Sequence, residues 1–280
     1  MKTTKLIEVE GAGLYVTFEP GRDAERVPIL FLHANVADQR MWDGLWECLA
    51  MRHSLVSYDR RGFGQSRTVK PSPYSNLSDL WAVMNCLELE RAVLVGCSMG
   101  GRLAIDAALA RPDRVAGLVL VSPGVSGAPA PEHDAPVKAL VDAISLASAR
   151  GDIDTKNELQ ARLWLDGPLS PPCRVKGEER RLFLEMNGTA LRAVSPGVAS
   201  EALSAWDRLE EIQVKTLVMW GDLDLPHLQR RSQLVAQRMS AKSVVLSGTA
   251  HLPSLECPHQ FHEALAPFLA VGQWSSDRAE

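Results

Sequence analysis

The residues best placed for chemistry lie in Gly96-Cys-Ser-Met-Gly-Gly101, a G-x-S-x-G pattern. The pattern alone is weak, but here it follows the apolar run Ala92–Val95 and precedes a helical pattern. These neighbours predict Ser98 at a tight strand-to-helix turn, which projects its hydroxyl above the sheet edge, towards the amides of a helix N-terminus. The structural alternative is a serine that caps a helix. A phosphate-binding loop is disfavoured, because no Lys-Ser or Lys-Thr follows the glycines.

A serine hydroxyl needs a base, and the chain offers one in Gly248-Thr-Ala-His251-Leu-Pro. His251 follows the last apolar run, so we expect it at the carboxyl edge of the sheet, where Ser98 must also emerge. A carboxylate is then required to hold the imidazole in the correct tautomer. Asp222 and Asp224 both follow the run Thr216–Trp220, and either could instead cap the next helix.

Stabilising an oxyanion requires two backbone N–H groups. Met99, the residue after the serine, is expected to supply one. The loop after Ile29–Leu32 is expected to supply the other from Asn35, with Val36 as the neighbouring candidate. We expect His33 to brace this loop through hydrogen bonds, without reacting.

The other histidines carry weaker signals. His259 and His262 have i,i+3 spacing that suits a metal, but no third ligand is evident, so a solvated helix face is favoured and no metal site is predicted. His53 and His133 lie in polar sequence and are expected at the surface.

Short apolar runs alternate with helical patterns, which is typical of a mostly parallel sheet covered on both faces. An opening hairpin and six buried parallel strands give eight predicted strands: Leu6–Val9, Leu14–Phe18, Ile29–Leu32, Ser54–Tyr58, Ala92–Val95, Ala116–Val121, Thr216–Trp220 and Ser243–Leu246. Helices are predicted between them, at 39–51, 77–89, 99–110, 226–239 and 258–269.

One long stretch, 124–213, has no convincing strand. Its helical patterns at Val137–Arg150, Thr155–Leu165 and Glu178–Met186 predict an inserted helical cap. An irregular surface extension is the alternative. The predicted core then consists of residues 1–123 and 214–280.

Composition excludes several classes of protein. The chain has 280 residues, 46% hydrophobic and 23% charged, as in ordinary globular proteins. A net charge of −4 argues against a nucleic-acid or anionic-membrane surface. No apolar run approaches the roughly 20 residues of a membrane span. The five cysteines form no CxxC pair, and with no secretory signal visible we expect reduced thiols and a cytoplasmic location.

The chain resembles the α/β-hydrolase superfamily over nearly its whole length. The resemblance rests on several segments and on the order serine, aspartate, histidine: His33–Asn35, Met41-Trp42, Tyr58–Ser66, Gly96–Gly101, Trp220–Asp224 and Gly248–Pro258. It implies an α/β-hydrolase fold with Ser98 as nucleophile, Asp224 as acid and His251 as base, and with the amides of Asn35 and Met99 as oxyanion donors. The family usually has glycine where this chain has Ala34.

The resemblance also implies a reaction. Leu163–Pro168 is similar to the branch of 3-oxoadipate enol-lactonase-like proteins and small-ester hydrolases. We therefore expect hydrolysis of a carboxylic ester or lactone of a small, largely apolar molecule, without metal or cofactor. The alternatives are a C–C bond hydrolase, a perhydrolase, or a ligand-binding receptor with a vestigial triad. The apolar side chains predicted to contact substrate are Trp164, Leu165, Met186 and Leu252. The physiological substrate and the oligomeric state are left open.

Overall fold

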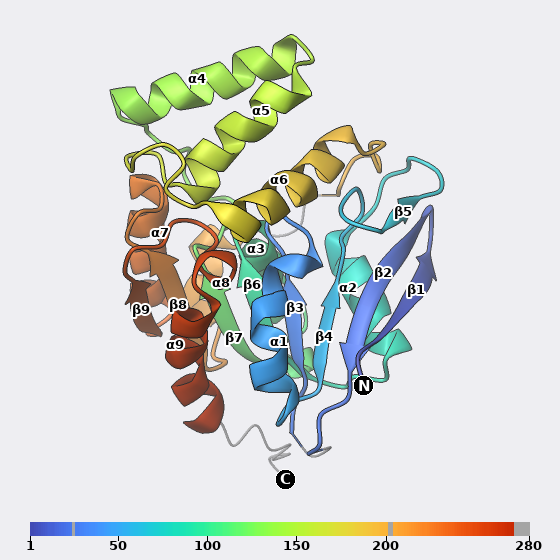
Figure 1. Ribbon diagram of the computed structural model, residues 1–280. Coiled ribbons are helices and arrows are strands. Elements are labelled where there is room, and N and C mark those ends of the chain that lie inside the picture. The colour runs from blue at the N-terminus through green and yellow to red at the C-terminus, as the bar shows by residue number, and fades with distance from the viewer. Residues whose placement is uncertain (24–25, 201–203, 272–280) are drawn as a thin grey trace.

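The computed structural model describes residues 1–23, 26–200 and 204–271 (Figure 1). Within these residues a nine-stranded sheet has the order β1-β2-β4-β3-β6-β7-β8-β9, with β5 paired to β2. The strands are β1 Thr3–Val9, β2 Ala12–Glu19, β3 Ile29–Leu32, β4 Leu55–Tyr58, β5 Arg67–Thr68, β6 Ala92–Cys97, β7 Val115–Val121, β8 Thr216–Gly221 and β9 Lys242–Leu246. The predicted mostly parallel sheet is confirmed. The ninth strand is β5, whose two residues are too few to show a period in the sequence.

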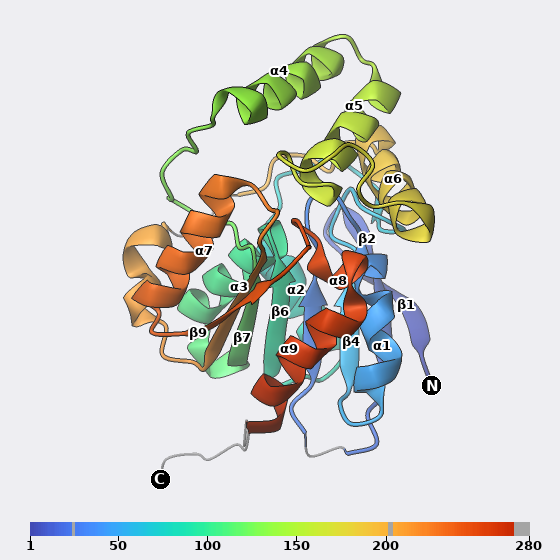
Figure 2. The same ribbon diagram turned by 60° about the vertical axis from the view of Figure 1, so that its left-hand side comes forward.

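Helices cover both faces of the sheet, and the strands show why. In β3, Ile29 and Phe31 pack into one apolar cluster while Leu30 and Leu32 pack into the other. A strand buried on both faces needs apolar residues at every position, which explains the unbroken apolar runs. The first cluster also holds side chains of α1 and α9, and the second those of α2, α3 and α7. Figure 2 shows how these helices lie against the sheet. These helices span Asp43–Ala50, Pro258–Val271, Asn76–Cys86, Met99–Ala110 and Pro226–Arg238.

The two ends of the sheet differ. The predicted hairpin is present, because β1 and β2 pair antiparallel from Thr3↔Phe18 to Val9↔Ala12. β9 was expected to be buried, and this is wrong for most of its length, since only Leu246 is fully buried there. The reason is its place: β9 is the last strand of the sheet, so a neighbouring strand covers only one of its edges.

Between β7 and β8 the chain forms α4 (Ala135–Ala149), α5 (Ile153–Gln160), a π-helical turn η3 (Ala161–Leu165), α6 (Gly177–Arg192) and a 3₁₀ segment η4 (Trp206–Glu211). Helices α4, α5 and α6 lie above the upper ends of the strands in Figure 1. The three helical patterns are therefore observed. That this insertion acts as a cap with boundaries 124–213 stays a prediction. Among the described residues, no helix is both long and apolar enough to cross a membrane.

Candidate active site

Ser98 occupies the predicted turn between β6 and α3, with φ 54° and ψ −111°. A non-glycine residue rarely adopts this conformation, and here neighbouring hydrogen bonds hold it in place. Its N–H donates to the Val121 carbonyl at 2.9 Å, and its carbonyl accepts from the N–H groups of Arg102 and Gly124, each at 2.9 Å. The strained residue is thus fixed on both sides by the backbone.

The flanking glycines are required by close backbone packing. A Cβ added at Gly96 would collide with the Gly100 carbonyl, and one at Gly100 would collide with the Leu32 carbonyl at the end of β3. Because backbone atoms leave no room for a side chain, the turn can form only with glycine at both positions. The sequence pattern therefore has a direct steric cause.

The acid and base candidates meet in a buried contact. The Nδ1 atom of His251 lies 2.9 Å from Oδ2 of Asp224, and the two side chains are 1% and 0% exposed. The other oxygen of Asp224 accepts from the Leu225 N–H at 2.7 Å. With Nδ1–H donating to the carboxylate, Nε2 of a neutral imidazole is left as the proton acceptor.

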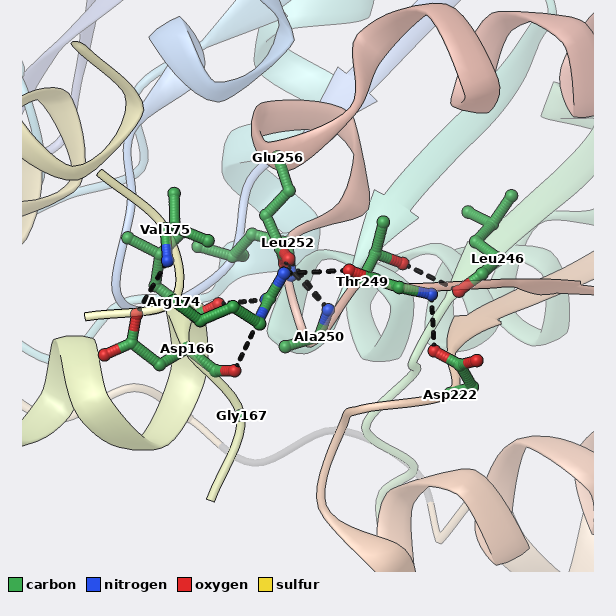
Figure 3. Close-up of polar contacts among 12 residues, drawn as sticks. Asp166, Gly167, Arg174, Val175, Asp222, Leu246, Thr249, Ala250, Leu252 and Glu256 are labelled. Carbon is green, nitrogen blue, oxygen red and sulfur yellow. Dashed lines mark hydrogen bonds and ion pairs between the residues drawn. The ribbon is translucent and has the colours of Figure 1, made fainter. Parts of the chain in front are cut away.

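Asp222 has a different set of contacts. Its carboxylate accepts from the Gly248 N–H at 2.7 Å and from the Ser247 hydroxyl at 3.0 Å, so it stabilises the turn after β9 (Figure 3). The geometry therefore distinguishes the two aspartates, which the sequence alone left as alternative partners of the histidine. One contacts the histidine, and the other shapes the loop that carries it.

The serine elbow adjoins the histidine loop through Cys97. The Cys97 thiol lies 3.4 Å from the His251 carbonyl oxygen, within hydrogen-bonding distance for sulfur. Within the described residues, no hydrogen bond joins the Ser98 hydroxyl to the His251 ring. Nucleophile–base hydrogen bonds are often long in ligand-free enzymes and form when substrate binds.

Two hydrogen bonds of the buried His33 hold the loop after β3, which is expected to supply an oxyanion donor. Nδ1 of His33 lies 2.7 Å from the Ala34 carbonyl, and its Nε2 accepts from the Arg60 N–H at 3.0 Å, so the bracing role expected of His33 is confirmed. Burial lowers the pKa of His33 well below its ordinary value, which keeps the ring neutral. Ala34 has no positive φ, so its methyl group causes no backbone strain of that kind.

The two predicted oxyanion donors occupy suitable elements. Met99 is the first residue of α3, so the helix itself does not use its N–H. Asn35 lies in a turn closed by the Ala37 N–H and the Ala34 carbonyl at 3.3 Å. Its side-chain oxygen accepts from Nη2 of Arg60 at 2.7 Å. Their role as oxyanion donors remains a prediction.

The predicted substrate contacts fall into two groups. The Trp164 ring lies 4.6 Å from the His251 ring between centroids, and the Trp164 carbonyl accepts from the His251 N–H at 3.2 Å. Leu165, Met186 and Leu252 are fully buried in the apolar cluster on the α1 and α9 face, so they expose no surface here. A substrate-binding role for any of the four residues remains a prediction.

A network that the sequence did not predict holds the histidine loop (Figure 3). The Glu256 carboxylate accepts from the N–H groups of Ala250 and Leu252, which flank His251, at 2.9–3.2 Å. Arg174 forms an ion pair with Glu256 at 2.5 Å. The same guanidinium donates to the carbonyls of Leu165 and Asp166 at 2.7 Å and to that of Gly248 at 2.8 Å.

This network joins the insertion to the core. Asp166 is fully buried and accepts from the N–H groups of Cys173 and Val175, which fixes the segment carrying Arg174. The only sequence signal was Glu256 itself, a charged residue directly after Leu255 and five residues after the histidine. Nothing in the sequence pointed to Arg174.

The structure also shows the surroundings of two other histidines. His53, expected at the surface, is only 4% exposed, because the chain turns there from α1 directly into the buried strand β4. No group of three or more metal-binding side chains occurs in the described part of the chain, and the His259 side chain is 87% exposed.

Fold and site together define a class. A mostly parallel sheet with a strained serine after β6 and a buried Asp–His pair at later loops is the arrangement of α/β-hydrolases. Residues 29–264 match the model of the alpha/beta hydrolase family, and the chain belongs to that family.

Individual relatives cover most of both chains. The chain is 28% identical to 2-hydroxy-6-oxo-6-phenylhexa-2,4-dienoate hydrolase of Burkholderia cepacia, over 87% of this chain and 88% of that one. It is 22% identical to 3-oxoadipate enol-lactonase 1 of Acinetobacter baylyi, over 86% and 88%. The structure of Est816, an N-acyl homoserine lactone degrading enzyme, matches with a TM-score of 0.72 and 26% identity, over 94% of this chain and all of that one.

Proposed function

We propose that the protein hydrolyses a carboxylic ester or lactone through an acyl-enzyme formed on Ser98. The observation that carries the proposal is the buried contact of 2.9 Å between His251 Nδ1 and Asp224. In the same fold, a serine with strained backbone geometry, Ser98, lies at the turn between β6 and α3. The similarity to a lactone-degrading enzyme and to an enol-lactonase supports a lactone or ester substrate.

The reaction follows from these positions. Nε2 of His251 takes the proton of the Ser98 hydroxyl as the oxygen attacks the carbonyl carbon. The amides of Met99 and Asn35 stabilise the resulting oxyanion. The protonated imidazole, stabilised by Asp224, then gives its proton to the leaving alcohol, and a water molecule repeats the sequence on the acyl-enzyme.

A second candidate is hydrolysis of a C–C bond with the same three residues. It is favoured by the 28% identity to a dienoate hydrolase, whose named substrate is neither an ester nor a lactone. A panel containing esters, lactones and a 6-oxo-dienoate separates the two candidates, because each predicts a different preferred member.

Labelling tests the common step. A serine-directed phosphonate should add one label per chain, on Ser98, as read by peptide mass spectrometry. Ser98→Ala should remove the label and most of the turnover of a 4-nitrophenyl ester. Ser145→Ala is the matched control, because Ser145 is exposed on α4 and its hydroxyl donates only to the Val141 carbonyl. Labelling without turnover on any ester or lactone would favour a receptor. A folded protein without label would remove Ser98 from this role.

A further inference from the structure

Beside the serine elbow lies a buried arginine, Arg60, that forms an ion pair with no carboxylate in the described part of the chain. Arg60 is 5% exposed, and its Nη2 donates to two neutral oxygens, the His33 carbonyl at 3.3 Å and the Asn35 side chain at 2.7 Å. Its Nε has no hydrogen-bond partner within residues 1–23, 26–200 and 204–271. Among the described residues, no carboxylate forms an ion pair with it.

The next residue, Arg61, is a buried arginine that does have a carboxylate partner. Arg61 is equally buried, but it donates to both oxygens of Asp79, at 2.7 and 2.9 Å. Those hydrogen bonds raise the pKa of Arg61, whereas burial lowers the pKa of Arg60 to about 10. A buried charge is costly unless it is compensated, and Arg60 is compensated by neutral oxygens and by the Phe63 ring, 4.7 Å from its guanidinium, but by no carboxylate of the described residues.

Arg60 also lines a pocket that adjoins the elbow. The pocket is small, with a cavity volume of about 70 Å³, and Met99, the residue after the nucleophile, forms part of its wall. Asn35, the other predicted oxyanion donor, contacts the Arg60 side chain directly. An anion held by Arg60 would therefore lie close to the carbonyl that Ser98 attacks.

The remaining pocket wall is compatible with one negative charge. Asn76 and Leu77, the first two residues of α2, line it, and their N–H groups lie at the positive end of that helix. Arg102 and Asp106 also line it and form an ion pair with each other at 3.7 Å, and Asp106 accepts from the Ser126 hydroxyl.

We propose that this pocket binds a carboxylate of the substrate, with Arg60 as its principal partner. The inference rests on the proposed function and narrows its substrate class to esters or lactones of acids that carry a second carboxylate. Such a substrate supplies the missing counter-ion of Arg60 and places its reacting carbonyl near Met99 and Asn35.

A matched pair of esters tests the proposal. Mono-4-nitrophenyl adipate and 4-nitrophenyl hexanoate have acyl chains of equal length and differ by a terminal carboxylate in place of a methyl group. Wild type should have the higher kcat/KM for the adipate. Arg60→Met should lower the ratio of the two kcat/KM values by about ten- to a hundredfold, as expected for a hydrogen bond to a charged group. Arg67→Met, at an exposed arginine of the same segment, should leave the ratio unchanged.

The ratio of the two kcat/KM values distinguishes loss of carboxylate binding from a general loss of activity. Loss of the contact between Arg60 and Asn35 would slow the hydrolysis of both esters alike. An unchanged ratio in folded Arg60→Met, with turnover that depends on Ser98, would overturn the anion site and leave the proposed function intact. Should Arg60→Met not fold, adipate and adipamide are compared as inhibitors of wild-type hexanoate hydrolysis. Equal inhibition by the two would overturn the proposal.

A binding measurement keeps the two proposals distinct when neither ester is turned over. Calorimetric titration of Ser98→Ala with adipate should give heat that adipamide does not give. Binding of adipate together with absent labelling of Ser98 would support the anion site and reject the acyl-enzyme. Absence of binding would reject the anion site.

Discussion

Replacing Arg174 by methionine should destabilise the protein and slow the reaction, because Arg174 compensates a buried charge beside the proposed base. The Glu256 side chain is 2% exposed and that of Arg174 is 21% exposed. Removing one partner of a fully buried pair costs about 3–5 kcal/mol. Because solvent partly screens Arg174, we expect a loss of about 2–3 kcal/mol in the free energy of unfolding.

The loss should depend on pH in a defined direction. Burial, the largest effect, raises the pKa of Glu256, and the ion pair with Arg174 lowers it. Without Arg174 the pKa of Glu256 in the folded state rises further, while its value in the unfolded chain stays near 4.5. The folded state then binds the proton more tightly, so stability falls as pH rises from that unfolded value through the folded pKa. Each unit of additional shift contributes about 1.4 kcal/mol at high pH.

Urea unfolding at pH 5 and pH 8, followed by circular dichroism, measures this directly. Arg174→Met should lose more stability at pH 8 than at pH 5, and adding Glu256→Gln should recover part of the loss at pH 8, because no buried charge then remains. The control is Arg181→Met, at an exposed arginine paired with Glu178, for which we expect no measurable change in the free energy of unfolding at either pH. Equal losses at both pH values, or no recovery in the double variant, would refute the reasoning.

Two further predictions concern the residues around His251. Asp224→Asn should lower turnover by up to about 10⁴-fold by favouring the wrong histidine tautomer, whereas Asp222→Asn should cost far less, and steady-state kinetics showing the reverse order would contradict the assignment. Trp164→Ala should lower kcat and change the relative preference among esters of different size, since its ring packs on His251; a variant that alters only the melting temperature would leave Trp164 a packing residue.

The sequence predicted well those features that are fixed by neighbouring residues. The serine elbow depends on glycines two positions before and two after Ser98, and the structure shows backbone atoms in contact with both. Apolar runs likewise predicted the parallel strands, because a strand buried on both faces needs apolar residues at nearly every position. β5 was missed for the opposite reason, since two residues show no period.

What the sequence could not predict are pairings between distant segments. Arg174 and Glu256 are 82 positions apart, and Arg174 lies in a segment between η3 and α6 that has no regular pattern. The fold brings them together because the insertion returns over the loop after β9, as the contact of Arg174 with Glu256 shows (Figure 3). Trp164 of the insertion also contacts His251 in this loop. The base is thus held from the core by Glu256 and from the insertion by Trp164 and Arg174. A movement of the insertion would therefore be transmitted to the proposed base.

Arg60 and Arg61 show the same limit within a single dipeptide. Both follow β4 and both are buried, so composition and hydropathy treat them alike. Arg61 reaches Asp79 on α2, while Arg60 reaches the loop after β3 that carries Asn35. Only the tertiary structure shows that one guanidinium is neutralised and that the other is held, without a carboxylate from the described residues, beside the predicted oxyanion donors. A buried guanidinium without a carboxylate partner costs stability, and the fold would be more stable if Arg60 were paired or replaced by an apolar residue. We therefore expect a ligand to supply the anion.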